Sequence, residues 1–165
     1  MNRRTLGLGL LLLTALSSGC HSRKKIVIED NQKLLEHAQN LISRRRLLEA
    51  VQVLGDVGLV TPVAETLDPK IKLALADAYF YQGGTVNVVE AQGRYEQFMS
   101  FYPTHPSASY ARYQIGACLF EQSQRPANDQ EYPRRALDHF NAMVKDLPAD
   151  DPWGMAARVM VAKAQ

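Results

Sequence analysis

The sequence predicts an all-α protein: a right-handed solenoid of about three helical hairpins followed by one further helix. Apolar residues recur at helical spacing through nearly all of residues 31–165, a pattern that indicates amphipathic helices. One spacing of small, large and proline residues also occurs three times, and such repetition is the signature of stacked structural repeats. A compact helical bundle is the alternative that these observations leave open.

The repeated spacing identifies the second helix of each hairpin. An alanine is followed by large apolar residues at +4 and +7 and by proline at +12. The small residue lets the paired helix approach, the large residues fill the space to the next hairpin, and the proline ends the helix. This is the pattern of the second helix of a tetratricopeptide repeat. The three copies are Ala50-Leu54-Val57-Pro62, Ala91-Tyr95-Phe98-Pro103 and Ala136-Phe140-Met143-Pro148.

The first helices are marked by small residues at Ala38, Ala76 and Gly116. The alanines of the second helices lie 41 and 45 residues apart, more than the 34 residues of a standard tetratricopeptide repeat, so the loops should carry insertions. We expect these insertions at 62–69, 85–87 and 124–132.

Two Asp-Pro pairs predict helix starts, because a carboxylate at the N-cap accepts free backbone N–H groups and proline suits the first helical position. They are Asp68-Pro69 and Asp151-Pro152. The second pair opens a helix over 152–164, the first of an incomplete fourth hairpin. We expect its apolar face, with Trp153 and Met160, to be exposed and to self-associate or bind a partner.

The N-terminus has the pattern of a secretory signal that ends in a lipidated cysteine. Arg3 and Arg4 precede an apolar run over 6–16, and small residues lead to Cys20. The charged start, short apolar run and small residues indicate a signal peptide, and the cysteine resembles the lipobox of bacterial lipoproteins. An ordinary signal peptide with an unrelated cysteine is the alternative.

This interpretation divides the chain into three parts: a signal peptide over 1–19, a lipidated linker over 20–30 that includes a short strand-like patch at 26–28, and a tetratricopeptide-repeat domain over 31–165. Cleavage would remove two of the 19 Lys and Arg residues, leaving 17 against 17 Asp and Glu. A near-neutral mature protein has too little charge to bind nucleic acid electrostatically. His21 after the cysteine favours the outer membrane over the inner one.

No catalytic motif is found in the sequence. The four histidines have no metal-ligand spacing, and phosphate-binding glycine loops and a nucleophile elbow are both missing. We therefore expect no enzyme activity, no cofactor and no metal. Cys118 lies in an apolar helical stretch and is expected to be a buried thiol, Gly83-Gly84 a turn, and Arg44-Arg45-Arg46 a solvated turn.

The first helices of such arrays line a concave surface, which is the expected partner-binding site. Aromatic side chains there give a large contact area for a peptide at low entropic cost. Some of the rings belong instead to the core, and the tyrosines are the better groove candidates because a hydroxyl can remain hydrated. The expected groove residues are Leu35, Asp77, Phe80, Tyr81, Tyr110, Tyr113, Phe120 and Glu121, with Gln39 and Ile42 beside them.

Residues near the middle of the chain resemble a known family. The run Phe98-Met99-Ser100-Phe101-Tyr102-Pro103-Thr104-His105-Pro106 and the later Tyr110, Tyr113 and Gly116 are similar to the junction between the second and third repeats of BamD proteins. The stretches Asn128-Asp129-Gln130 and Arg134-Arg135-Ala136-Leu137 are similar to the insertion and helix that follow there. BamD proteins are tetratricopeptide lipoproteins of the outer-membrane β-barrel assembly machinery.

The resemblance implies a periplasmic scaffold anchored to the outer membrane through Cys20. Its implied partners are a BamA-like barrel assembly protein and the C-terminal signals of unfolded outer-membrane proteins. The family has about five repeats, so this shorter sequence is expected to be a shortened paralogue, a fragment or a substrate-side adaptor. The alternative function is a tetratricopeptide pilotin-type lipoprotein that escorts a secretin or pilus component.

Overall fold

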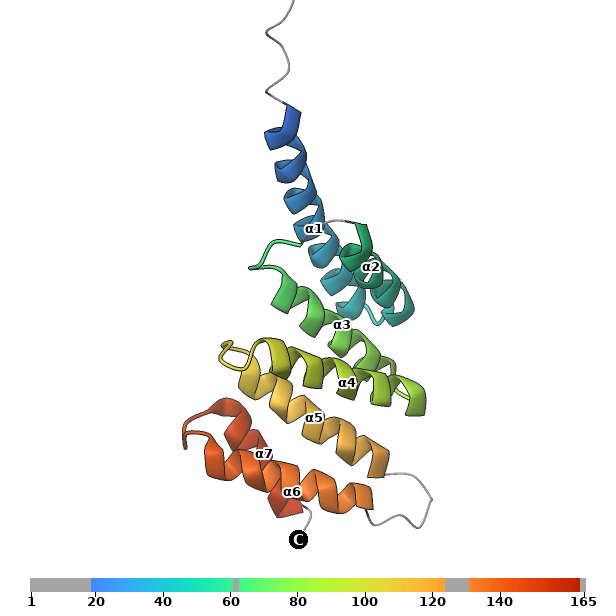
Figure 1. Ribbon diagram of the computed structural model, residues 1–165. Helices are drawn as coiled ribbons and strands as arrows, with labels where there is room; N and C mark the ends of the chain where they lie inside the picture. The colour runs from blue at the N-terminus through green and yellow to red at the C-terminus, as the bar shows by residue number, and fades with distance from the viewer. Residues whose placement is uncertain (1–18, 61–62, 124–130, 164–165) are drawn as a thin grey trace, which may run out of the picture.

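The chain is described by a computed structural model over residues 19–60, 63–123 and 131–163. Within these ranges every regular element is an α-helix, and the helices stack one after another along a single axis (Figure 1). The all-α prediction is therefore confirmed. The helices are α1 (Gly19–Ser43), α2 (Leu47–Val60), α3 (Asp68–Gln82), α4 (Thr85–Phe101), α5 (Ala108–Ser123), α6 (Glu131–Asp146) and α7 (Pro152–Lys163).

Each helix packs mainly against its neighbours in the sequence, so that α1–α2, α3–α4 and α5–α6 form successive hairpins. The first helices of neighbouring hairpins also meet, because α1 contacts α3 and α5 contacts α7. Contacts limited to adjacent units are the defining property of a repeat solenoid. The fold agrees with a tetratricopeptide-like array of three hairpins and one further helix.

The repeated alanine, +4 and +7 positions form the inner side of every second helix. None of these nine side chains is more than 2% exposed. Five of the six +4 and +7 residues are among the largest fully buried side chains of the described residues: Tyr95, Phe98, Phe140, Leu54 and Met143. The predicted role of this spacing is confirmed.

The small residues of the first helices are needed where helices approach closely. Ala38 and Ala76 have no exposed surface. At Gly116 an added Cβ would lie 2.6 Å from Cε1 of the Phe140 ring, so α5 and α6 pack at a distance that only glycine allows. This prediction is also confirmed.

Only one of the two Asp-Pro pairs caps its helix as expected. Asp151 Oδ1 accepts the backbone N–H groups of Trp153 and Gly154, each at 2.8 Å. Asp68 instead lies inside α3, whose N-cap is Leu67, and makes no capping bond. Its carboxylate accepts the Tyr102 hydroxyl across the interface, so a tertiary contact takes the place of the cap.

Several connections differ from the expected ones. Gly83 and Gly84 have φ of 70° and 76° and form the predicted turn, but residues 85–87 begin α4 and carry no insertion. The backbone of residues 20–30, including the strand-like patch at 26–28, belongs to α1. Helices α4 and α6 end just before Pro103 and Pro148 as predicted. Of the insertion expected at 124–132, residues 131 and 132 begin α6, whereas residues 124–130 and Pro62 lie outside the described residues.

The last described helix exposes a different face from the one expected. Trp153 and Met160 are partly buried against α5 and α6, and the exposed apolar side chains are Met155 at 47% and Val159 at 53%. The prediction of an exposed Trp153 and Met160 is wrong because Trp153 packs between two tyrosine rings of α5.

Candidate functional site

A hollow on the first-helix face is lined by residues of α1, α3 and α5 and has a volume of about 370 Å³. Figure 1 shows these helices following one another down the stack. Its lining comes from all three helices and from the end of the α4–α5 loop: Gln39, Ile42, Ser43, Lys70, Leu73, Ala74, Asp77, Ser107 and Tyr110.

The hollow combines an apolar floor with a polar rim. Ile42, Leu73 and Ala74 supply the apolar surface. Ser43 and Ser107 supply hydroxyl groups beside them. Binding sites commonly have this composition, since apolar surface gives affinity and a few polar groups fix orientation.

Lys70 gives the hollow its positive charge. It is exposed, it is the only basic residue in the lining, and no ion pair joins it to another described side chain. A ligand with a negatively charged group would therefore meet an ammonium that has no ion pair with the described side chains.

Asp77 lies in the wall of the hollow, but its carboxylate is already bonded within the protein. Its Oδ1 accepts hydrogen bonds from the hydroxyls of Tyr95 and Tyr110, each at 2.5 Å. Burial raises the pKa of the Asp77 carboxyl, and these two hydrogen bonds act against that rise. The carboxylate thus joins α3 to both α4 and α5.

Tyr110 contacts the hollow, the Asp77 carboxylate and the last helix. Gln114 Nε2 donates to its hydroxyl at 2.9 Å. Its ring centroid lies 4.8 Å from that of Trp153, and Tyr113 lies 5.3 Å from the same indole. An aromatic cluster of Tyr110, Tyr113 and Trp153 therefore fixes α7 to α5.

The structure divides the eight predicted groove residues into four groups, of which the last contains Leu35 alone. Asp77 and Tyr110 line the hollow. Tyr81 and Glu121 are exposed but lie outside its lining. The remaining rings are partly buried against the core: Phe80, Tyr113 and Phe120.

Leu35 is 4% exposed and belongs to the core formed with Ala38 and Leu54. The expectation that it faces the groove is wrong, because α2 covers that side of α1. Gln39 and Ile42 were expected beside the groove residues, and the structure agrees, since both line the hollow.

Lys70, Leu73 and Ala74 line the hollow but were not among the predicted residues. They lie seven, four and three positions before Asp77, so they share one face of α3 with it. The helical spacing could have identified them once Asp77 was selected.

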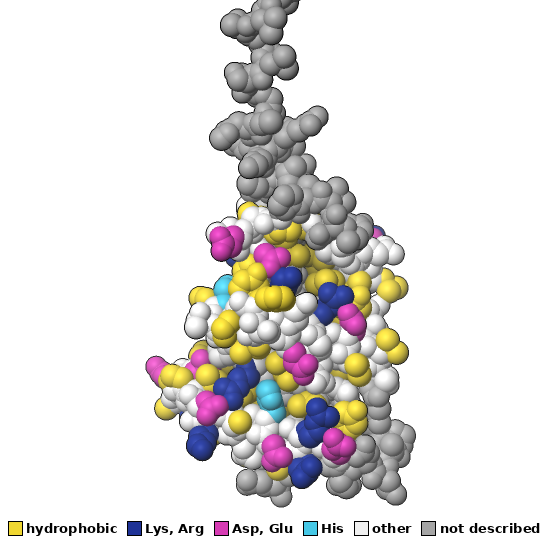
Figure 2. All heavy atoms as spheres, in the orientation of Figure 1, with side chains coloured by type: hydrophobic (Ala, Val, Ile, Leu, Met, Phe, Trp, Pro, Cys, Tyr) yellow, Lys and Arg dark blue, Asp and Glu magenta, His cyan; other side chains and the backbone are white. Residues whose placement is uncertain are grey.

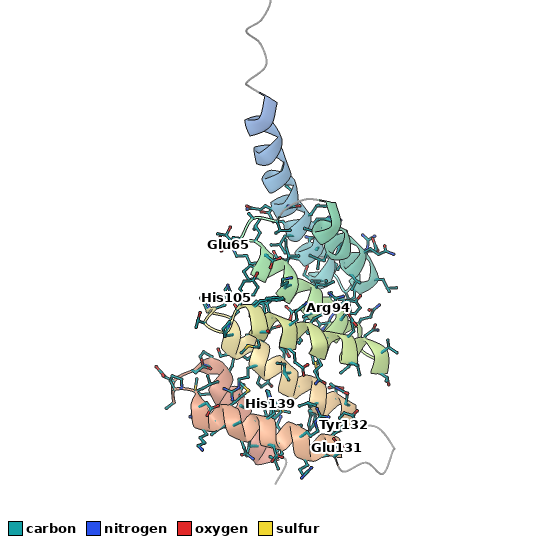
Figure 3. All side chains as sticks on the ribbon, in the orientation of Figure 1. Glu65, Arg94, His105, Glu131, Tyr132 and His139 are labelled. Atoms are coloured by element: carbon teal, nitrogen blue, oxygen red, sulfur yellow. The ribbon has the colours of Figure 1, made fainter. Side chains whose placement is uncertain are left out.

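A second hollow of about 280 Å³ lies where α2, α3 and α4 meet. It contains Lys72 and Arg94, but Lys72 pairs with Asp68 at 3.6 Å and Arg94 with Glu90 at 2.8 Å. Figure 3 shows Arg94 extending from α4, where its guanidinium stacks 4.9 Å from the Tyr79 ring. Because both cations of this second hollow are already paired, it is the weaker candidate for a binding site.

Chemistry beyond binding has little support among the described residues. None of them forms a group of three His, Cys, Asp or Glu side chains that could hold a metal. Cys118 has no exposed surface, and burial raises the pKa of its thiol to about 12, which keeps it protonated and unreactive. Figure 2 shows acidic and basic side chains interspersed over the visible face.

The exposed turn between α1 and α2 also agrees with the sequence. Arg44, Arg45 and Arg46 are exposed. The Arg45 guanidinium lies 5.4 Å from the centre of the Tyr81 ring, and Arg46 pairs with Glu49.

Among the helices described, none has the length and apolar character needed to cross a membrane.

Comparison with known proteins places this architecture in a family. The sequence matches the YfiO family, described as outer membrane lipoprotein, over residues 29–164. It is also 28% identical over 151 residues to the outer membrane protein assembly factor BamD of Caulobacter vibrioides, covering 88% of this chain and 48% of that protein. The chain thus spans about half the length of this relative. The family match includes all three helical hairpins and the hollow between them, and the chain belongs to the YfiO family of outer membrane lipoproteins.

Proposed function

We propose that this protein is a scaffold for outer-membrane β-barrel assembly, which binds partner proteins and unfolded barrel substrates at the hollow between α1, α3 and α5. The observation that carries the proposal is the unneutralised Lys70 beside an apolar floor on the first-helix face. The relative from Caulobacter vibrioides is named as an outer membrane protein assembly factor, and family membership supports the same role here.

An extended polypeptide has the chemistry that this hollow accepts. Its apolar side chains can cover Ile42 and Leu73, while its backbone N–H and C=O groups can bond with Gln39 and Ser107. An unfolded substrate exposes both kinds of group at once. The Asp77 carboxylate is already bonded to two tyrosine hydroxyls, so Lys70 is the charged residue of the lining that can pair with a ligand.

We also propose that Cys20 carries the lipid that holds the protein at the outer membrane, with the helical array in the periplasm. The apolar run and small residues before Cys20 support this assignment. A Cys20→Ser variant should then appear in the soluble or inner-membrane fraction, and mass spectrometry should find no acyl group. An acylated product in that variant, or unchanged outer-membrane fractionation, would contradict the proposal.

Site-specific photocrosslinking in living cells tests the binding site. A photoreactive phenylalanine replaces Gln39 at the hollow or Gln52, an exposed residue of α2 outside it. We expect Gln39 to crosslink newly made outer-membrane barrel proteins and Gln52 to give several-fold less product. An Ile42→Lys substitution should reduce the Gln39 product, since it places a charge on the apolar floor.

The same experiment separates the alternatives. Equal crosslinking from Gln39 and Gln52 would reject the hollow as the site. A secretin or pilus subunit as the main product at Gln39 would reject barrel assembly and favour a pilotin role. Barrel proteins that crosslink at Gln39 but not after the Ile42→Lys change would support the proposal in full.

A further inference from the structure

Tyr110 connects the hollow to the last helix by direct contact. One side of this residue lines the hollow, and its ring lies against Trp153 of α7 with 4.8 Å between centroids. Trp153 itself is absent from the lining of the hollow. A ligand in the hollow would therefore touch a ring whose other contact is with α7.

Asp77 holds the hydroxyl of Tyr110 by a hydrogen bond. The hydrogen bond from Tyr110 ends on the same oxygen that accepts the hydroxyl of Tyr95, and Tyr95 has no exposed surface. The tyrosine is thus fastened to the buried core of α3 and α4 through a single carboxylate. Hydrogen bonds to a charged acceptor are stronger than neutral ones, so this connection is directional and stiff.

The helix at the other end of the connection is the last one of the described stack. Among the described helices, α7 packs only against α5 and α6, and its outer side leaves Met155 and Val159 about half exposed. Elements with little buried surface open locally before the rest of a protein unfolds. A change in the position of Tyr110 would therefore act first on the docking of α7.

We propose that Asp77 and Tyr110 couple occupancy of the hollow to the docking of α7, with Asp77 as a positioning residue. This inference rests on the proposed function for the identity of the natural ligand, but the coupling itself does not depend on that ligand. A group that fills the hollow restrains the Tyr110 ring in its contact with Trp153 and so stabilises docked α7. By reciprocity, whatever stabilises docked α7 raises affinity at the hollow.

A chemical label tests the coupling without a natural ligand. In the full-length chain in detergent, with Cys20→Ser, a Ser43→Cys substitution allows N-phenylmaleimide to be attached at the hollow. Cys118 is buried and stays unlabelled. Hydrogen exchange then reports on α7, and the fluorescence of Trp153, the only tryptophan in the sequence, reports on the aromatic cluster. Ser100→Cys, exposed on α4 outside the hollow, carries the control label.

We expect the label at Ser43→Cys to slow exchange in α7 on the order of fivefold and to change Trp153 fluorescence, while the label at Ser100→Cys does neither. The effect should disappear when Tyr110→Phe is added, because the bond to Asp77 is lost. It should persist with Tyr113→Phe, whose hydroxyl bonds to no described residue. Circular dichroism verifies that each variant is folded.

Three results would overturn the coupling: unchanged exchange in α7 after labelling at the hollow, equal slowing with Tyr110→Phe, or equal slowing in α3 and α4. The last result would mean that the label stabilises the whole array. Since no natural ligand is used, these results leave the photocrosslinking test of the proposed function unaffected, and a failure of crosslinking leaves the coupling intact.

Discussion

The first and second helical hairpins bury the same three positions with different chemistry. In α2 the triad is Ala50, Leu54 and Val57, whose side chains are aliphatic and buried. In α4 the matching positions hold Ala91, Tyr95 and Phe98, equally buried, and Tyr95 adds a hydroxyl bonded to Asp77.

The two hairpins show two contributions to helix packing, burial of apolar area and a directional hydrogen bond. Aliphatic burial stabilises the association of helices, but it is non-directional and tolerates repacking when volume is conserved. A buried hydrogen bond fixes one arrangement and is costly to leave unmade. The bond from Tyr95 to Asp77 therefore fixes α4 against α3, and α3 forms one wall of the hollow.

The largest expected effect comes from removing a buried ring of the second hairpin. Phe98→Ala should lower the free energy of unfolding by about 3–5 kcal/mol, because the ring has no exposed surface and leaves a cavity. Phe101→Ala on the same helix is the matched control, and its 60% exposed ring predicts a loss of less than about 1 kcal/mol. Urea unfolding measures both, and equal losses would contradict the burial pattern.

The directional bond should be the next largest contribution. Tyr95→Phe keeps the ring and removes one donor from Asp77, so we expect a loss of about 1.5–3 kcal/mol. Tyr79→Phe is the control, since the Tyr79 hydroxyl bonds to no described residue. If both variants unfold at the same urea concentration, the first and second hairpins differ only in side-chain shape.

The close approach in the third hairpin gives a smaller effect. Gly116→Ala places a methyl group 2.6 Å from the Phe140 ring, which is 2% exposed and has no room to move. We expect a strain cost of about 1–3 kcal/mol, offset in part by the higher helix propensity of alanine, about 1 kcal/mol. Gly93→Ala, with nothing within 4 Å of the new atom, should instead stabilise. A stabilised Gly116→Ala protein would show that α5 and α6 can separate at no cost.

The second-helix triads could be predicted from the sequence because their positions are enclosed on both sides. A spacing of +4 and +7 places Leu54 and Val57, or Tyr95 and Phe98, on one helix face, and the flanking hairpins bury that face completely. The spacing of apolar residues in these helices therefore predicts directly which side chains are buried.

The site was harder to predict, because first helices divide their residues between the core and the hollow. Leu35 and Gln39 are one helical turn apart on α1, yet α2 covers one and the hollow exposes the other. The roles of Asp68 and Asp77 depend on Tyr102 and on Tyr95 and Tyr110, which lie 34, 18 and 33 residues away. No local pattern encodes such distant partners, and the same is true of the contact between Trp153 and α5.

The third hairpin buries a histidine whose burial makes stability depend on pH, which gives the smallest effect. His139 Nε2 donates to the backbone carbonyl of Arg112 at 2.7 Å, and Figure 3 shows His139 at the junction of α5 and α6. Burial lowers the pKa of His139 below its ordinary 6.5. The folded protein therefore binds fewer protons than the unfolded chain, so this contribution to stability is present above about pH 6.5 and is lost as the pH falls through the folded-state pKa.

A His139→Gln variant keeps a donor at this position and does not titrate there. Its free energy of unfolding should therefore fall less steeply between pH 7 and 5 than that of the native sequence. Identical slopes for the native protein and the His139→Gln variant would mean that the α5–α6 contact accepts a charged imidazole at no cost in stability.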